Sequence, residues 1–474
     1  MAEMKLVDTP FPLFGVVRRF GRKDADALSE KPFTPWAVNM RPQDPFTTRY
    51  RGGSRPGLAP YVANDQPEWP TGALADETGA LITTETGDEI HVPIGGAEAL
   101  YPDLYEAMKA YGYGNIPETL TATVGTAPTS VSVGCTYRDR LVLASGKDVY
   151  MSRLGDWTDW GYGGDVEDAG RAFVLQPSEA GEIADTVSAL IPHRDAALLI
   201  ATTNELWVVD GDPCDDGSLK CVSRDVGIVG PTAWTKVGDA IVFLAKDGLW
   251  KVGFNGSGLE PISGDKLPDE LSDVDAVNYD IMLGYRHSEN GVYVFIEGYI
   301  YHWFFDMTFK GFWPFELRSL VVSAAFVADG ELVIKDADGL FWTFDGEDDD
   351  GLAIQSHVLL GPVRAASGVE YSLLSAIHGA VETEPSGSVT WRIITADTAE
   401  LACERAKDAV DTYRDGDTVT SMDYVVASGT WNDGRSRMSY PRTRGMWHVI
   451  WLQSNSVWAC DNVVAEMNPV GRWR

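Results

Sequence analysis

Short apolar runs separated by polar turns dominate the middle of the chain. In the clearest example, residues 141–144 are apolar, residues 145–148 have turn chemistry, and residues 149–152 return as a second strand. This pattern predicts a β-hairpin. Because a hairpin cannot bury a face alone, further sheet must pack against it.

The same plan recurs at 195–209, 238–252, 290–305 and 329–344. Each unit pairs an apolar strand with a strand that carries an aromatic residue, and these are Tyr150, Trp207, Trp250, Tyr301 and Trp342. Their spacing of roughly 40 to 57 residues is typical of four-stranded propeller blades. The pattern predicts a mainly β fold with a β-propeller-like repeat domain. An irregular β-sandwich whose hairpins merely look alike stays open, as does the number of blades.

The chain divides into three predicted parts. Residues 1–130 are rich in Pro and Gly and predict an extended N-terminal arm with assembly contacts, a hairpin at 78–93 and a helix at 97–110. Residues 131–362 hold the repeats. Residues 363–474 predict additional C-terminal β-strands at 388–395, 421–428, 445–452 and 463–467 and a short helix at 398–410. This last part either completes the propeller or forms a platform.

The charge of the chain limits its function. There are 38 Lys and Arg against 70 Asp and Glu, a formal net charge of −32. Such a field repels nucleic-acid phosphate and anionic lipid, although DNA can slide past carboxylates without being held. A solvated acidic surface explains the same charge. No apolar run reaches membrane-spanning length, so we expect no membrane anchor.

Catalytic and metal-binding patterns are missing from the sequence. The seven histidines are isolated, no Walker loop or Gly-x-Ser-x-Gly elbow occurs, and residues 155–160 lack the pattern of a sialidase Asp-box. The acidic run 347–350 is either a Ca²⁺-binding turn or, as we favour, a solvated loop. Of the five cysteines, Cys214 and Cys221 flank a turn, and free thiols are favoured over a local disulfide. We expect no enzymatic activity, cofactor or metal.

Several motifs, in order, resemble the tail nozzle proteins of short-tailed bacteriophages, also called tail tubular protein B. They comprise the element at 39–42 followed by 51–58, the runs 138–144 and 149–156, the run 198–210 followed by 227–231, and the ending at 442–447 and 469–474. The resemblance covers most of the chain.

This resemblance implies a structural virion protein of the phage tail, assembled in the host cytoplasm. Its expected partners are identical subunits in a hexamer, the tail adaptor protein, and tail fibre or spike proteins. Double-stranded DNA would pass through the ring during ejection without specific binding. Two alternatives remain: a monomeric carbohydrate-binding or glycan-processing β-propeller, and a tail adaptor or other connector ring.

The proline-rich arm is the predicted intersubunit contact, because extended segments with unpaired backbone groups readily add to a neighbour's sheet. The candidate residues are Asn39, Arg41, Pro42, Arg51, Arg55 and Pro56. We expect the aromatic residues between 303 and 315 to pack mostly in the core.

Overall fold

The computed structural model describes residues 4–16, 33–61 and 122–472. The last range has short interruptions at 164, 166–167, 176–180, 194, 277, 300, 319, 329, 338, 366–369, 417–418, 420–421 and 433–436. The predicted hairpin at 78–93 and the predicted helix at 97–110 lie outside the described residues.

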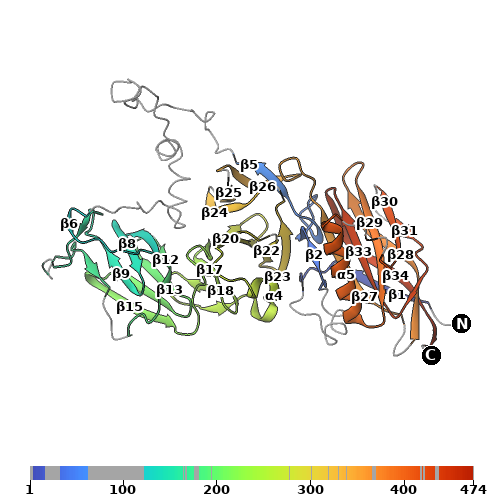
Figure 1. Ribbon diagram of the computed structural model, residues 1–474, viewed down its shortest axis with the longest axis horizontal. Coiled ribbons are helices and arrows are strands. Elements are labelled where there is room, and N and C mark those ends of the chain that lie inside the picture. The colour runs from blue at the N-terminus through green and yellow to red at the C-terminus, as the bar shows by residue number, and fades with distance from the viewer. Residues whose placement is uncertain are drawn as a thin grey trace, which may run out of the picture.

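The described residues form an elongated molecule with two kinds of β-structure (Figure 1). Five four-stranded antiparallel sheets, here called blades 1 to 5, make up one end and the middle of this row of units: blades 1 and 2 lie at the end, and blades 3, 4 and 5 are grouped in the middle. A C-terminal unit of two larger sheets and one helix lies beyond blade 5. The predicted fold class is confirmed: the protein is mainly β, with propeller-like repeats, an extended N-terminal arm and additional C-terminal strands.

The first four blades are each built from strands in sequence order, except that a short β11 forms the last strand of blade 1. Blade 1 contains β7 (Val133–Tyr137), β8 (Arg140–Ser145), β9 (Asp148–Met151) and β11 (Phe173–Val174). Blade 2 contains β12 (Val187–His193), β13 (Ala197–Thr202), β14 (Leu206–Asp212) and β15 (Asp215–Ser223). Blade 3 contains β16 (Trp234–Val237), β17 (Ala240–Ala245), β18 (Gly248–Gly253) and β19 (Glu260–Pro261). Blade 4 contains β20 (Ile281–Arg286), β21 (Gly291–Ile296), β22 (Tyr301–Asp306) and β23 (Gly311–Glu316).

Short elements fill the connections. The two-residue strands β6 (Val124–Gly125) and β10 (Asp159–Trp160) pair in parallel beside blade 1. A 3₁₀ turn, η1 (Gly264–Lys266), and one turn of helix, α4 (Asp269–Ser272), connect blades 3 and 4.

Blade 5 is completed by the N-terminal arm. Its first three strands are β24 (Val322–Ala328), β25 (Glu331–Asp336) and β26 (Phe341–Gly346), and its fourth is β5 (Gly57–Pro60). The register pairs Trp342 with Pro60 and Thr343 with Ala59. The C-terminal strands, which the sequence offered as candidates to complete a blade, belong to the other unit instead.

The C-terminal unit combines strands from both ends of the chain. Its seven-stranded sheet contains β1 (Lys5–Pro10), β3 (Met40–Gln43), β4 (Tyr50–Ser54), β28 (Glu370–Thr383), β31 (Arg437–Ser439), β32 (Thr443–Gly445) and β34 (Trp458–Arg472). Its five-stranded sheet contains β2 (Ala37–Val38), β27 (Ser356–Val363), β29 (Ser388–Ala396), β30 (Val425–Asn432) and β33 (Trp447–Ser454). The arm therefore contributes four strands to this unit and one to blade 5.

One long helix, α5 (Ala399–Arg414), packs on β27, β29 and β33. The Thr398 side chain caps its first turn by accepting a hydrogen bond from the Leu401 amide. Its buried residues recur at helical spacing and are mostly small, namely Ala399, Ala402, Cys403, Ala406, Ala409 and Val410. Small side chains let the helix lie close to the sheet.

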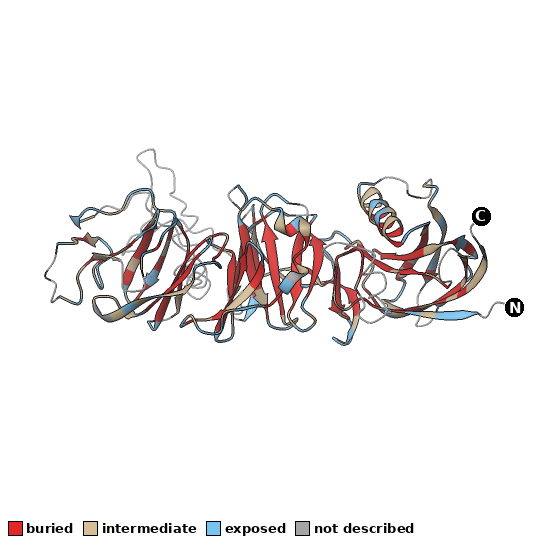
Figure 2. Ribbon diagram, turned by 90° about the horizontal axis from the view of Figure 1, so that it is seen from below, coloured by how far each residue is buried: buried red, intermediate tan, exposed pale blue. Residues whose placement is uncertain are grey.

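The buried residues, red in Figure 2, form two hydrophobic cores. The smaller core lies between blade 1 and one face of blade 2, and it includes Trp207 and Val209 of β14. The other face of β14 sends Leu206 and Val208 into the larger core, which continues through blades 3 to 5 into the C-terminal unit. Because blades cover both faces, β13 and β17 are buried along their whole length rather than alternating, and all their residues except Thr202 are apolar.

Candidate assembly site

The arm segment 33–61, the predicted assembly element, lies where blade 4, blade 5 and the C-terminal unit meet. β2 pairs with β27, β3 and β4 join the seven-stranded sheet, and β5 joins blade 5. The candidate residues Asn39 to Pro56 therefore lie at a three-way joint within one chain.

Arg55 is the centre of this joint and is only 1% exposed. Its guanidinium forms a bidentate ion pair with Asp349, with Nη1 2.9 Å from Oδ1 and Nη2 bonded to Oδ2. Nη2 also donates to the Glu316 carbonyl oxygen at 2.8 Å, and Nε donates to Asn39 Oδ1 at 2.9 Å. The planar fork of an arginine suits such a set of acceptors.

Asn39 completes the contact from the other side. Its φ of 57° lies in the left-handed region, which Asn tolerates better than most residues. Its side-chain oxygen accepts from the Glu316 amide at 3.0 Å, and its Nδ2 donates to the Gln355 carbonyl oxygen at 2.7 Å. Asn39 thus ties the arm to the last residue of β23 and to the approach to β27.

Arg41 is inserted among the aromatic side chains of blade 4. Its guanidinium carbon lies 4.1 Å from the ring centroid of Phe304 and 5.0 Å from that of Phe315. Its Nε is 3.6 Å from Glu289, which also accepts a hydrogen bond from Tyr293. Burial, together with the Glu289 charge, raises the pKa of Tyr293 to about 12. This contact is a desolvated cation–π site.

Arg51 lies nearer the surface and joins the arm to β28. Its guanidinium contacts Asp44 at 2.7 Å and Glu382 at 2.6 Å. Burial alone would raise the pKa of Asp44, but hydrogen bonds from Arg51, Thr47 and Phe46 lower it overall. The ion pair fixes the loop between β3 and β4 against the sheet.

The two candidate prolines differ in burial. Pro42 is buried within β3, and Pro56 is half-buried beside Arg55, which donates to its carbonyl oxygen at 2.8 Å. The structure supplies intramolecular partners for Asn39, Arg41 and Arg55 and leaves almost none of their surface accessible. Their contact with a neighbouring subunit stays a prediction, one that this burial does not support.

A second ion-pair cluster, which sequence reasoning missed, joins α5 to blade 4. Glu316 is bonded to Arg414 of α5 and to Arg318, whose Nε is 2.8 Å from Glu316 Oε1. Burial raises the pKa of Glu316, although Arg318 and Arg55 oppose this, and burial lowers the pKa of Arg414 to about 10. A single Glu at the end of an apolar strand gives no sequence signal for such a role.

Other sequence predictions can be placed as well. The aromatic residues predicted to lie in the core are all buried, and they are Trp303, Phe304, Phe305, Phe312, Trp313 and Phe315. The acidic run 347–350 is not uniformly solvated, because Asp349 is buried against Arg55. All five cysteines are free thiols. Burial raises the pKa of Cys135 and of Cys460 to about 12.

The described part of the chain lacks a metal-binding cluster and a membrane-spanning helix. It contains no group of three or more His, Cys, Asp or Glu side chains placed to hold a metal ion. None of its helices combines the length and apolar character that crossing a bilayer requires.

No protein-family model and no curated protein matches the sequence. Several solved structures are similar to this chain. One is a Saccharomyces cerevisiae complex of Dbp5 with Nup159 and Gle1, which has 12% sequence identity and a TM-score of 0.30. The match covers 48% of this chain and 64% of that chain. The Hsv2 protein of Kluyvelomyces marxianus shares 10% identity, with a TM-score of 0.29 and coverage of 51% and 65%. The Cps50 (Swd1) β-propeller domain of Myceliophteria thermophila shares 11% identity, with a TM-score of 0.29 and coverage of 53% and 71%.

This chain spans less than two thirds of the first two of those chains. Similarity at this level carries no argument about function. The class that the strands themselves define is a mainly β protein of propeller-like blades joined to a C-terminal β unit.

Proposed function

We propose that this protein is the tail nozzle subunit of a short-tailed bacteriophage. In this role about six copies form a ring at the distal end of the tail, below the adaptor protein. The ring provides the channel through which the genome leaves and the surface to which fibres or spikes attach. The protein has a structural role, and DNA passes without being specifically bound.

One observation carries the proposal. The two arm motifs that resemble nozzle proteins, at 39–42 and 51–58, hold the side chains that join blade 4, blade 5 and the C-terminal unit. Motifs that fix the relative position of three units are what a ring subunit requires, because each subunit must present two interfaces at a constant angle. The net charge of −32 agrees with a channel wall that repels DNA phosphate.

The test is electron microscopy of the purified protein, combined with its mass from light scattering at several concentrations, with and without the adaptor. We expect six-fold rings with an open axis. A persistent monomer in both conditions, together with binding in a glycan screen, would favour the carbohydrate-binding propeller instead.

A further inference from the structure

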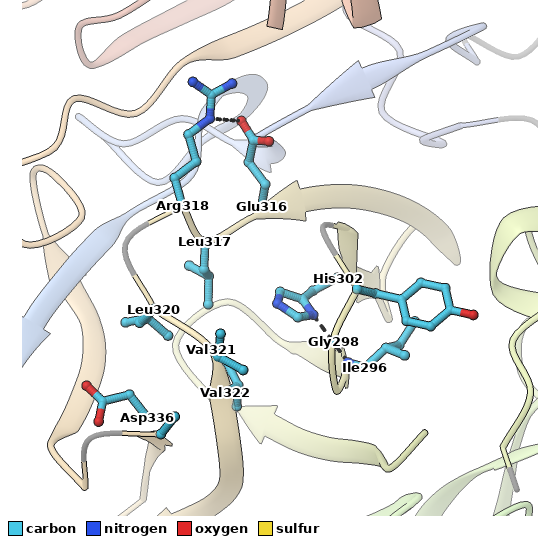
Figure 3. A pocket seen from close by; sticks show the side chains of 12 residues that line it. Ile296, Gly298, His302, Glu316, Leu317, Arg318, Leu320, Val321, Val322 and Asp336 are labelled. Atoms are coloured by element: carbon cyan, nitrogen blue, oxygen red, sulfur yellow. Dashed lines mark hydrogen bonds and ion pairs between the residues drawn. The ribbon is translucent and has the colours of Figure 1, made fainter. Parts of the chain in front are cut away.

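A cavity of about 560 Å³ opens between blades 4 and 5 (Figure 3). This volume falls within the roughly 300–1,000 Å³ range of ligand sites. Its apolar walls come from the ends of β21 and β24 and from the connection between β23 and β24, through Ile296, Leu317, Leu320, Val321 and Val322. The polar side chains that line it are His302, Glu316, Arg318, Asp336 and Tyr299.

His302 supplies a fixed hydrogen-bond donor at this cavity. The residue is only 4% exposed, and its Nδ1 accepts a hydrogen bond from the Ile296 amide at 3.2 Å. Burial, aided by the Arg55 charge, lowers the pKa of His302 to about 3, so the ring is neutral. Its proton is therefore on Nε2, which has no hydrogen-bond partner among the described residues. Figure 3 shows the ring beside Val321 and Leu317 at the cavity.

The buried carboxylates that line the cavity are already engaged. Asp336 accepts hydrogen bonds from the Leu340 amide and from Trp342 Nε1, both at 2.8 Å. Glu316 is paired with Arg318 and Arg414. Arg318 and Tyr299 also line the cavity, but each is 37% exposed, so His302 supplies the buried donor among the apolar walls. This arrangement suits an apolar body that carries an acceptor oxygen.

A tyrosine side chain has this chemistry, and the chain itself exposes one. Tyr440 is 62% exposed, the highest value among the large aromatic side chains described. It lies in the excursion 440–442 between β31 and β32, which both pair along the same edge of β28. Arg442, with a φ of 51°, turns the chain back toward that edge. Among the described residues, the Tyr440 hydroxyl has one hydrogen-bond contact, to the sulfur of Met438 at 3.2 Å.

The charges near Tyr440 and near the cavity also favour contact between the two surfaces. In a chain with a net charge of −32, Tyr440 is followed by two exposed arginines, Arg442 and Arg444. The exposed carboxylates Glu297 and Asp280 lie beside the cavity, where the Glu297 amide donates to the Asp280 carbonyl oxygen next to the lining residues Ile296 and Gly298. A basic projection and an acidic rim attract each other, whereas most other surface pairs would repel.

We propose that the cavity between blades 4 and 5 binds the Tyr440 side chain of a second copy of this chain, with His302 Nε2 donating to the phenol oxygen. β31 lies in the C-terminal unit, away from blades 4 and 5 in the row (Figure 1), so the projection and the cavity occupy different surfaces. A contact between two different surfaces is heterologous. It generates a ring when the rotation from each subunit to the next adds up to a full turn. The inference rests on the proposed ring and names its interface.

The test compares assembly of four variants with the wild type by sedimentation velocity in the presence of the adaptor. Tyr440→Phe keeps the ring and removes the acceptor, so we expect about five- to tenfold weaker association. Tyr440→Ala removes the projecting side chain, and Val321→Trp fills the mouth of the cavity. Each of these two variants should abolish ring formation. Leu154→Trp is the matched control, since Leu154 is 47% exposed on blade 1 and Val321 is 55% exposed. Wild-type assembly by Tyr440→Ala and Val321→Trp would overturn the inference while leaving the ring intact.

A second measurement does not need a ring. We expect 4-ethylphenol to bind the wild-type protein at least fivefold more tightly than ethylbenzene in NMR titrations, because only the phenol accepts from His302. Val321→Trp should remove both signals. Equal affinity for the two probes, or no binding, would overturn the assignment of His302. Phenol binding by a protein that forms no ring would instead overturn the proposed function and the second-copy occupant.

Discussion

Two of the fully buried arginines, Arg140 near the smaller core and Arg55 near the larger one, are satisfied in opposite ways. Arg140, in blade 1, donates to the carbonyl oxygens of Ser152, Arg171 and Ala169 at 2.8, 2.7 and 2.6 Å. These acceptors belong to its own blade and its connections, and Nη2 also lies 3.7 Å from the Asp212 carboxylate of the adjacent blade 2. Arg55 instead bonds to Asp349 and to the Glu316 carbonyl, which are 294 and 261 residues away along the chain.

Arg140 therefore bonds mainly to residues near it in the sequence, whereas Arg55 bonds to residues far from it. Arg140 organises a loop that is synthesised together with it, so the smaller core is largely self-contained. Arg55 joins segments that are far apart along the chain, in addition to the pairing of β5 with β26, and its partner carries a buried negative charge. Losing Arg55 should therefore cost more and spread further than losing Arg140.

The largest expected effect follows from Arg55→Met. This change leaves the Asp349 carboxylate buried without its partner, which typically costs about 3–5 kcal/mol. Guanidinium denaturation should show the loss, and hydrogen exchange should accelerate first in β5, β26 and the arm. The control Arg51→Met removes an ion pair whose arginine is 20% exposed and whose Asp44 carboxylate keeps hydrogen bonds from Phe46 and Thr47, so it should cost about 1–3 kcal/mol. Adding Asp349→Leu should recover much of the stability. Equal losses for Arg55→Met and Arg51→Met would show that the joint does not depend on the buried pair.

The second prediction concerns the pH dependence of stability that Asp306 of blade 4 causes. Asp306 accepts a hydrogen bond from the Phe309 amide at 2.6 Å, and burial raises its pKa to about 6. The folded chain therefore holds this proton more tightly than the unfolded chain, so this carboxyl lowers stability as the pH rises from about 4 to 6. Asp306→Asn removes that dependence. Relative to wild type, the variant should gain up to about 3 kcal/mol between pH 4 and pH 7. Parallel stability curves for the two proteins would contradict the prediction.

The smallest expected effect comes from Arg140→Met. Buried carbonyl oxygens that lose a donor cost roughly 1–3 kcal/mol, and water near the blade 1 loops can replace part of the loss. Hydrogen exchange should accelerate in blades 1 and 2 and stay unchanged in blade 5. Equal loss of protection in blade 5 would mean that the two cores unfold as one unit.

The repeated strands were predictable because their signal is local. Apolar runs such as 197–202 and 240–245, each bounded by turn residues, specify buried strands in any context. Strand partners were not predictable, because β34 pairs with β1, β4 and β28 from three distant segments.

For the candidate site, the sequence singled out the arm residues 39–56 but not the environment in which they lie. Asp349 belongs to an acidic run that is typical of a solvated loop, and only the fold shows that Arg55 neutralises it. His302 is an isolated histidine in a strand. Its free donor depends on the Ile296 amide, which the turn between β21 and β22 brings back to it.

The completion of blade 5 by β5 has a consequence for biosynthesis. Residues 57–60 leave the ribosome early, yet their partners at 341–346 are translated only after four blades have emerged. Vectorial folding can complete blades 2 to 4 in order, since each uses consecutive strands. The arm must wait through that period with its strand edges unpaired, and a nascent chain stalled before residue 341 would expose them to aggregation or chaperones.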